Sequence, residues 1–323
     1  MTLHISEDEV GALLTMPMAI EAVEEISRKQ ASGEVVVHPR RRFEFSGGRF
    51  FHYMAAADHS ANRVATKQYT YLNGQLKFVV SLYSMETGDL LALIEGDSLS
   101  QRRTGAASGV ATRYMARADA KTAAIVGTGW QAEAQLEAIA TVRKLEKVTV
   151  YGRDAARREE FVRKMDERLK LSVRAAASSA EAVRGAMIVC AATTSSQPVV
   201  FGADLASGAH VNAIGANHMR KRELDDVAVL KADVVVVDSI EQSRQEAGDL
   251  VLGFASDVSR WDGLRELSQV VAGKAATRTS DSQLTLFKSN GIAAWDLAAA
   301  MRIYEEVASR KMGRTLPLWQ TAS

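Results

Sequence analysis

The segment AIVGTGWQAEAQ, residues 124–135, combines residue types that suit the binding of a phosphorylated ligand. An apolar stretch leads into Gly127, Gly129 and Ala132, which have G-x-G-x-x-A spacing, and a helical stretch follows. The first glycine permits a tight turn, the second lets the backbone approach a pyrophosphate, and the alanine allows close helix–strand packing. Unpaired N–H groups at the helix start favour the anion. In this strand–turn–helix context the spacing predicts a dinucleotide site, and the alternative is a glycine-rich structural turn.

The next apolar strand, VTVYG, ends without the acid that usually binds the ribose 2′-hydroxyl of NAD. Gly152 occupies that place and Arg153 follows, and a planar guanidinium with several donors suits a 2′-phosphate. Asp154 is the alternative acid, but it directly precedes a helical run, where such a side chain commonly caps the helix. The sequence therefore favours NADP(H) over NAD(H). The alternative role for Arg153 is a solvated surface charge.

A second unusual segment is EGDSLSQRRTGAASGVATRYMAR, residues 95–117. We expect a helix to open at the small residues Gly105–Gly109, with Arg103 just before it. The N–H donors of a helix start and a bidentate arginine would together form a carboxylate pocket. The alternative is tight helix–sheet packing beside an exposed arginine, which explains the small residues equally well.

The elements that must position these residues fall into two regions. The first begins with a capping box at Ser6 and Glu9 and a helix that stops at Gly33. Short strands rich in β-branched and aromatic residues follow, separated by turn residues, and predict an antiparallel meander. From Lys121 onward, apolar strands alternate with helical stretches, as in a parallel sheet covered on both faces.

The predicted fold class is therefore α/β, with a doubly wound Rossmann-type parallel sheet and a second, α+β domain that contains the meander. We expect the Rossmann domain to span residues 119–292. The second domain is expected to be discontinuous, with residues 1–118 and 293–323, because the last helix returns to it.

Composition limits the function classes. The chain has 323 residues and a net charge of +1, which argues against a broad nucleic-acid surface. Cys190 is the only cysteine and lies in an apolar strand, so we expect a buried structural side chain. No histidine pair has metal-ligand spacing, so no metal is predicted. Without a membrane-spanning run or an apolar signal core, a cytoplasmic protein is expected.

Four segments together resemble the ornithine cyclodeaminase/mu-crystallin family: RRTGAASGVATRYMA, AIVGTGWQAEAQ, VNAIGANHMRKRELD and SQLTLFKSNGIAAWDLAAA. With the meander, the resemblance covers nearly the whole chain. It implies a substrate domain built from both chain ends and pairing of these domains into a homodimer. Activities in the family include NAD-dependent cyclodeamination of ornithine to proline, alanine dehydrogenation and reduction of cyclic ketimines by NAD(P)H.

The resemblance also implies site residues. Arg103 matches the arginine that holds the substrate carboxylate, and Lys67 matches the lysine beside the nicotinamide, where a lowered pKa would let it pass a proton. Arg41 aligns with a second carboxylate contact, with Arg40 as the alternative. The turn and the resemblance together place these residues against the cofactor: Gly127, Thr128, Gly129, Trp130, Gln131, Arg153, Thr193, Thr194, Lys288 and Ser289.

The chain departs from the family at three places. Asn217 stands at a catalytic position where the cyclodeaminases carry an aspartate, and an amide is not a general base. Asp225 and Asp226 follow soon after, but they sit at a helix start and are expected to be structural. A short YTYLNGQ hairpin replaces a longer loop, which puts Gln75 where a threonine often contacts substrate. His52 replaces a glutamate and is expected to be structural rather than a substrate contact.

These residues predict an NAD(P)H-dependent reductase of small imino acids, acting in reverse as an amino-acid dehydrogenase. The substrate would be a carboxylate-bearing C=N compound such as a cyclic ketimine. One alternative is ornithine cyclodeaminase, an NAD-dependent lyase that gives proline and ammonia. A second is an NADP(H)-dependent binding protein of the mu-crystallin type.

Overall fold

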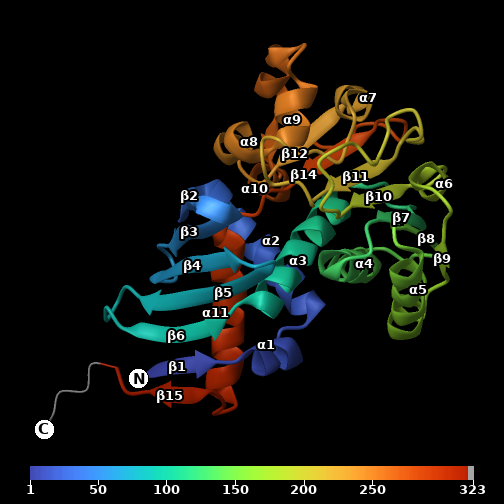
Figure 1. The fold of residues 1–323 in the computed structure, drawn as a ribbon. Helices are drawn as coiled ribbons and strands as arrows, with labels where there is room; N and C mark the ends of the chain where they lie inside the picture. Colours follow the sequence, from blue (N-terminus) through green and yellow to red (C-terminus); the bar gives the residue numbers. More distant parts are fainter. Residues whose placement is uncertain (319–323) are drawn as a thin grey trace, which may run out of the picture. The chain divides into compact units, whose positions relative to one another are not determined.

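The computed structural model describes residues 1–318 and divides the chain into two units (Figure 1). One unit consists of Met1–Thr104 together with the segment that begins at Gly291, and the other is Gly105–Asn290. The division at 104 and 105 falls inside a helix, whereas the sequence placed it just after that helix. Each unit contains one sheet, and the predicted α/β class is confirmed.

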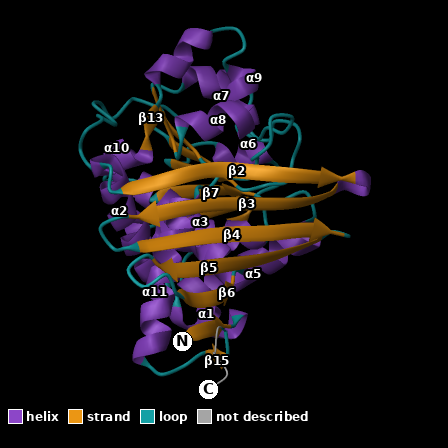
Figure 2. Cartoon of the chain, turned by 90° about the vertical axis from the view of Figure 1, so that its left-hand side faces the viewer, coloured by secondary structure: helices purple, strands orange, loops and turns teal. Residues whose placement is uncertain are grey.

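The sheet of the first unit has the strand order β15-β1-β6-β5-β4-β3-β2. The predicted antiparallel meander forms its larger part. The bounds of the meander strands are β2 Val35–Phe45, β3 Arg49–Asp58, β4 Arg63–Leu72, β5 Gln75–Ser84 and β6 Leu90–Glu95, with the 3-10 turn η1 Ser46–Gly48 between β2 and β3. Figure 2 shows the meander strands side by side across this sheet.

Two short strands widen this sheet beyond the meander. Strand β1 (Thr2–Ile5) pairs parallel with β6, and β15 (Arg314–Leu316) pairs antiparallel with β1. The sequence did not indicate either strand, because segments this short carry almost no alternation of polar and apolar residues. The sheet is therefore mixed rather than purely antiparallel.

Three helices belong wholly to the first unit: α1 (Glu7–Leu13), α2 (Met16–Ser32) and α11 (Ala293–Ser309). The predicted capping box at the start of α1 is present, and Gly33 ends α2 in the left-handed conformation, with φ 84°. Helix α11 is buried along most of its length because it packs against β2, β3, β4, β5 and α2. It thereby brings the end of the chain against the meander.

The second unit contains an eight-stranded parallel sheet with the order β13-β12-β14-β11-β10-β7-β8-β9. The order reverses at β7, which makes the sheet doubly wound. The strands are β7 Thr122–Val126, β8 Lys147–Tyr151, β9 Val173–Ala175, β10 Ile188–Ala191, β11 His210–Ala213, β12 Val234–Val237, β13 Arg265–Glu266 and β14 Thr285–Lys288. The helices are α4 Trp130–Val142, α5 Ala155–Leu169, α6 Ser179–Val183, α7 Asp226–Lys231, α8 Ile240–Glu246, α9 Gly248–Gly253 and α10 Leu267–Val271, with the 3-10 turn η2 Val258–Gly263.

The central strands of this sheet are fully buried, in keeping with their continuous apolar sequences. Cys190 lies in β10 with no exposed surface, as expected, and burial raises the pKa of its thiol. Asp225 caps α7 by accepting a hydrogen bond from the Ala228 N–H at 2.8 Å, which is the structural role predicted for it.

The helix expected to open at Gly105 begins eight residues earlier, so that prediction is wrong. Helix α3 spans Asp97–Met115, and Gly105–Gly109 lie in its middle. A Cβ at Gly105 would lie 2.5 Å from the Ala134 carbonyl oxygen of α4, so the missing side chain allows close packing of two helices. The backbone N–H groups near Arg103 are therefore inside a helix and cannot serve as carboxylate donors.

Candidate active site

The glycine-rich turn of the second unit has the geometry of an anion site. Gly127 has φ 118°, and a Cβ there would overlap the Ala192 carbonyl oxygen, so the turn requires glycine. Gly129 is the N-cap of α4, and a Cβ at Gly129 would meet no atom within 4 Å. No side chain caps α4, which leaves N–H groups of its first turn for an anion in the open space above Gly129.

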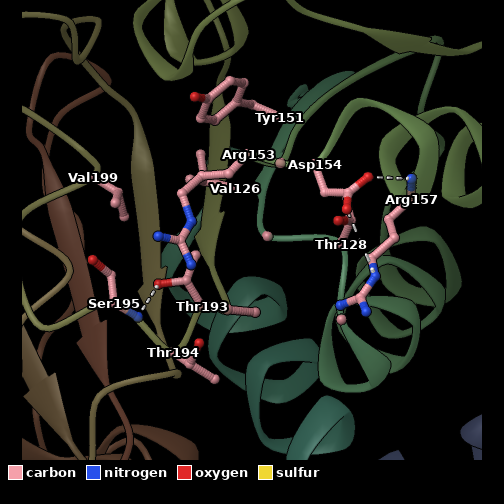
Figure 3. A pocket seen from close by; sticks show the side chains of 14 residues that line it. Val126, Thr128, Tyr151, Arg153, Asp154, Arg157, Thr193, Thr194, Ser195 and Val199 are labelled. Carbon is pink, nitrogen blue, oxygen red and sulfur yellow. Dashed lines mark hydrogen bonds and ion pairs between the residues drawn. The ribbon is translucent and has the colours of Figure 1, made fainter.

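A cavity of about 690 Å³ lies beside this turn (Figure 3). Its walls are the turn itself, the end of β8 and the segment that follows β10. Of the residues predicted to contact a cofactor, six line it: Gly127, Thr128, Gly129, Arg153, Thr193 and Thr194. Its volume, its open helix N-terminus and its place at the reversal of the strand order all fit a dinucleotide.

Two arginines line the cavity after β8: Arg153 precedes α5, and Arg157 lies in its first turn. Asp154 is the N-cap of α5 and accepts a hydrogen bond from the Arg157 N–H at 3.0 Å, as predicted. Figure 3 shows Arg153 and Arg157 on either side of Asp154 along the cavity. A Cβ at Gly152 would lie 2.5 Å from the Thr128 hydroxyl oxygen, so an acidic side chain there would have to displace Thr128.

Four residues predicted to contact the cofactor lie outside the lining of this cavity. Trp130 is half-exposed on α4, and the Gln131 side-chain oxygen is buried in the described structure without a hydrogen-bond partner. Lys288 is fully buried, with its Nζ 2.9 Å from the Asp249 carboxylate. The Ser289 hydroxyl donates to the Asp238 carboxylate at 3.2 Å. The last two therefore make contacts inside the protein.

A cluster of buried charges occupies the first unit. Lys67 on β4 donates to Asp296 Oδ1 at 2.8 Å, and the Arg103 Nε on α3 donates to the same oxygen at 3.0 Å. Asp296 lies in the first turn of α11 and is 1% exposed. Arg40 on β2 donates through Nη2 to the Gly291 carbonyl oxygen at 3.2 Å. Four separate elements thus bring three cations and one carboxylate together.

Lys67 has a strongly perturbed pKa. Burial, together with the positive charges of Arg103 and Arg40, lowers the pKa of its ammonium group to about 7, although the Asp296 carboxylate opposes this shift. The Nζ atom also lies 4.9 Å from the centre of the Phe78 ring. A group with a pKa near neutrality can give up and regain a proton during a reaction.

Arg103 and Asp296 each have one buried side-chain atom without a hydrogen-bond partner within the described residues. The two atoms are Arg103 Nη1 and Asp296 Oδ2. Gly291 has φ 82°, and a Cβ there would lie 2.6 Å from Arg103 Nη1, so glycine leaves room for the guanidinium. Buried polar groups are normally hydrogen-bonded. An unpaired donor on Arg103 and an unpaired acceptor on Asp296, two residues that share a hydrogen bond, therefore indicate a place for a polar ligand.

The structure brings Arg40, and not Arg41, into this cluster. The register of β2 against β3 shifts between His38 and Arg41, which inserts one extra residue. Arg40 consequently has a buried guanidinium, whereas Arg41 pairs across from Tyr53 and is exposed. Pro39 lies within the shifted stretch, and proline inside a strand is typical of edges and bulges. That signal does not say which of the two following arginines faces inward, so the prediction of Arg41 was not corrected by it.

Three other candidates have different surroundings. Gln75 is exposed at the tip of the β4–β5 hairpin, and Asn217 is exposed in the segment after β11. His52 is buried on β3, with its Nδ1 bonded to the Tyr69 hydroxyl. Burial and the charges of Arg40 and Arg42 lower the His52 pKa to about 3, so its imidazole is neutral.

Sequence reasoning missed Asp296 altogether. The residue is 229 positions from Lys67 in the chain, and no local spacing connects them. A signal was nevertheless present, because Asp296 is the lone acid in the apolar helical segment IAAWDLAAA. A single charge on the buried face of a helix requires a partner, and here the partners are Lys67 and Arg103.

No helix within residues 1–318 is long and apolar enough to cross a membrane. No group of three or more His, Cys, Asp or Glu side chains in that range could hold a metal ion.

Known proteins resemble this chain over most of its length. A Δ1-pyrroline-2-carboxylate reductase of Bacillus cereus is 38% identical over 239 residues, which cover 74% of this chain and 73% of that protein. The structure of the Thermococcus litoralis enzyme of the same name, in complex with NADH and L-proline, superposes with a TM-score of 0.93 at 33% identity, covering 97% and 100% of the two chains. An archaeal alanine dehydrogenase dimer with bound NAD gives a TM-score of 0.92 at 30% identity, covering 98% and 99%.

The family profile matches as well. The ornithine cyclodeaminase/mu-crystallin profile covers residues 2–311, which includes the glycine-rich turn, the end of β8 and every member of the charged cluster. The four segments that first suggested this family lie within the same range. The chain belongs to the ornithine cyclodeaminase/mu-crystallin family.

Proposed function

We propose that this protein is an NAD(P)H-dependent oxidoreductase that reduces the C=N bond of small imino acids bearing a carboxylate, and oxidises the corresponding amino acids in reverse. The observation that carries this proposal is the Lys67–Arg103–Asp296 cluster. It combines a lysine whose pKa is about 7 with a buried donor and a buried acceptor that lack partners. Similar proteins named as Δ1-pyrroline-2-carboxylate reductases support the substrate class.

Two guanidinium groups bind the substrate carboxylate in this proposal. The Arg103 Nη1 donor is buried and free of partners in the described structure, and the Arg40 guanidinium lies against the same Gly291 backbone. Three cations against one carboxylate leave the buried cluster with excess positive charge. A bound carboxylate offsets that excess through charge-assisted hydrogen bonds, which is how an anionic imino acid is selected over a neutral imine.

Lys67 and Asp296 then handle the nitrogen of the substrate. The Lys67 ammonium donates a proton to the imine nitrogen, which makes the adjacent carbon more electrophilic. The free Oδ2 of Asp296 accepts the resulting N–H and orients it, while Oδ1 keeps its bonds to Lys67 and Arg103. When bound, the reduced nicotinamide supplies the hydride that completes the amine. In the reverse direction, neutral Lys67 takes the proton from the amine.

We further propose that the preferred cofactor is NADP(H). Arg153 after β8 and Arg157 on α5 line the cavity. Asp154 is occupied as a helix cap, and an acid at position 152 would have to displace Thr128. Replacing Arg153 with alanine removes charge-assisted bonds worth about 1.5–3 kcal/mol, which raises the Kd of NADPH roughly 10- to 150-fold. The Kd of NADH should change little. Arg163→Ala, an exposed arginine on α5 paired with Glu167, is the matched control. Equal losses for both cofactors would contradict a 2′-phosphate contact.

We also propose that the protein is a homodimer formed through one face of the meander. Phe43, Phe51 and Tyr53 stack on that face, with ring centroids 5.8 to 6.4 Å apart, and Phe43 is 56% exposed. Aromatic groups gathered on an exposed sheet face are typical of a protein interface. The similar alanine dehydrogenase is a dimer, which supports a second copy of this chain as the partner that covers the aromatic face.

The activity is tested with purified protein, NADPH or NADH, and a panel of cyclic and linear imino acids. We expect oxidation of the reduced cofactor with carboxylate-bearing imines, and identification of the amino acid by mass spectrometry. Release of ammonia from ornithine without net cofactor turnover would establish the lyase instead. We do not expect this result, because Asn217 carries an amide where the cyclodeaminases carry an aspartate. Tight cofactor binding with no turnover on the whole panel would indicate a binding protein.

A further inference from the structure

A fully buried carboxylate joins the ends of two central strands in the second unit. Glu223 Oε1 accepts hydrogen bonds from the Thr193 N–H at 2.6 Å and the Thr193 hydroxyl at 2.8 Å. Its Oε2 accepts from the N–H groups of Gly215 at 2.6 Å and Ala216 at 3.2 Å. Thr193 follows β10 and Gly215 follows β11. One side chain thus accepts hydrogen bonds from the segments that follow β10 and β11, beyond the end of the pairing between these two strands.

A second buried pair, Asp249 and Lys288, supports the backbone of Glu223. Asp249 Oδ1 accepts from the N–H groups of Glu223 at 2.6 Å and Leu224 at 2.9 Å. The other oxygen of Asp249 lies 2.9 Å from Lys288 Nζ, and Lys288 in turn donates to the Ala216 carbonyl oxygen. The ends of β10, β11 and β14 are therefore tied into one network, and Asp249 and Lys288 have no exposed surface.

The segments joined by Glu223 are in close backbone contact with each other. A Cβ at Gly215 would overlap the Thr193 carbonyl oxygen, and a Cβ at Gly127 would overlap the neighbouring Ala192 carbonyl oxygen. The glycine-rich turn, the segment after β10 and the segment after β11 are thus stacked without side chains between them. Any shift of the Thr193 segment changes the shape of the 690 Å³ cavity, which Thr193 lines.

The form of the carboxylate matters for this role. Burial and the nearby Asp249 carboxylate raise the pKa of Glu223 above its usual value, although the Lys288 charge and the bonds from Thr193 favour the charged form. All four of its hydrogen bonds come from N–H or O–H groups that can donate, so the ionised carboxylate fits them best. Glutamine has nearly the same shape, but its amide nitrogen would face donors and could not accept their bonds.

We propose that Glu223 is a positioning residue for the nicotinamide half of the cofactor. In a doubly wound sheet the dinucleotide crosses the point where the strand order reverses, here between β7 and β10. Arg153 at the end of β8 lies on the adenosine side of that point, and Thr193 lies on the other side. Glu223 holds the backbone and the hydroxyl of Thr193, and so sets the surface on which the nicotinamide half rests. This inference depends on the proposed binding of NAD(P)H.

The test compares a whole cofactor with a fragment that lacks the nicotinamide half. Kd values of NADPH and of adenosine 2′,5′-bisphosphate are measured by calorimetry for the wild type, Glu223→Gln and Arg153→Ala. We expect E223Q to weaken NADPH binding by about tenfold or more and to leave the Kd of the fragment within about twofold. R153A, by contrast, should weaken both ligands, because both carry the 2′-phosphate.

A general loosening of the unit would give a different pattern. Equal weakening of NADPH and the fragment by E223Q would contradict the proposal, and so would unchanged binding of both. If E223Q does not fold, Glu223→Asp serves as the second variant, because it keeps the charge but its shorter side chain cannot reach Thr193 and Gly215 at once. It should reproduce the selective loss of NADPH binding.

Failure of the underlying function is distinguishable from failure of this inference. Wild-type protein that binds neither NADPH nor NADH would overturn both. Wild-type protein that binds NADPH, with an E223Q variant that binds it equally well, would overturn only the role of Glu223.

Discussion

Replacing Asp296 with asparagine should shift the pH dependence of imine reduction. The Asp296 carboxylate is the acceptor for both Lys67 and Arg103, and it raises the Lys67 pKa against the lowering effects of burial and of the two arginines. An asparagine keeps the shape but removes the negative charge. The Lys67 ammonium then stands between cations without compensation, so its pKa must fall below the present value of about 7.

The size of the shift follows from the 2.8 Å between Lys67 Nζ and Asp296 Oδ1. Even with the dielectric constant of bulk water, two unit charges at this distance attract by about 1.5 kcal/mol, or about one pK unit. The pair is almost fully buried, so one unit is a lower bound. A pKa of about 6 would leave roughly a tenth of Lys67 protonated at pH 7, against half in the wild type, which lowers the rate about fivefold.

The sign of the pH dependence comes from the role of Lys67 as proton donor. Reduction requires the protonated form, so kcat/KM should be level at low pH and fall as the pH rises through about 7. Oxidation of the amino acid requires neutral Lys67 and should rise over the same range. In Asp296→Asn both limbs should move to lower pH by at least about one unit. Steady-state rates in both directions, measured across the pH range with saturating cofactor, give the two limbs.

Asp58→Asn is a matched control for this experiment. Asp58 is a buried carboxylate of the same unit and lies 2.9 Å from Lys29 Nζ, outside the charged cluster. Its replacement should lower the melting temperature without moving either limb. The reasoning would be refuted if the limbs of Asp296→Asn coincided with those of the wild type, or if Asp58→Asn moved them equally.

Three further outcomes are expected. Gly291→Ala should raise KM for the imino acid tenfold or more and leave the Kd of NADPH unchanged, because its Cβ would lie 2.6 Å from Arg103 Nη1; an unchanged KM would contradict the carboxylate site. Arg40→Ala should raise KM in the same way, whereas Arg41→Ala should leave KM within about twofold. A larger effect of Arg41→Ala would show that Arg41, and not Arg40, contacts the carboxylate. Phe43→Asp should convert dimers to monomers in analytical ultracentrifugation, and a protein that sediments as a monomer without the substitution would disprove the interface.

The parts of the site that sequence could predict are those set by neighbours along the chain. The turn at Gly127 and Gly129, the absence of an acid at Gly152 and the cap at Asp154 each depend on a few consecutive residues. A strand, a tight turn and a helix start have local chemical requirements, so the residue types reveal them. The same holds for the capping box of α1 and for Gly33 at the end of α2.

The charged cluster could be predicted only in part, because it is assembled from distant segments. The residues around Arg103 indicated a carboxylate contact and the family resemblance added Lys67, but their shared acceptor Asp296 lies 229 and 193 positions away in the chain. Arg40 reaches the cluster through a register shift that changes which face of β2 it occupies. Such a shift is decided by pairing with β3, not by the residues around Arg40.

The small residues of α3 show how one pattern permits two structures. Gly105–Gly109 suit a helix start beside a ligand and equally suit the middle of a helix packed against another. Only the position of the Ala134 backbone decides between them. Lys288 is a similar case, because a lysine at the end of a strand beside a cofactor site is typical of a residue that contacts the cofactor. Its buried pairing with Asp249 became evident only in three dimensions.

In the proposed mechanism, two buried arginines select a carboxylate-bearing imine, which Lys67 and Asp296 then prepare for reduction. The most direct test compares Δ1-pyrroline-2-carboxylate with 1-pyrroline, the same ring without the carboxylate, in a single assay of NADPH oxidation. We expect turnover of the carboxylated ring with formation of proline, and a kcat/KM for 1-pyrroline that is lower by a factor of about 100 or more. Equal turnover of the two imines would contradict it.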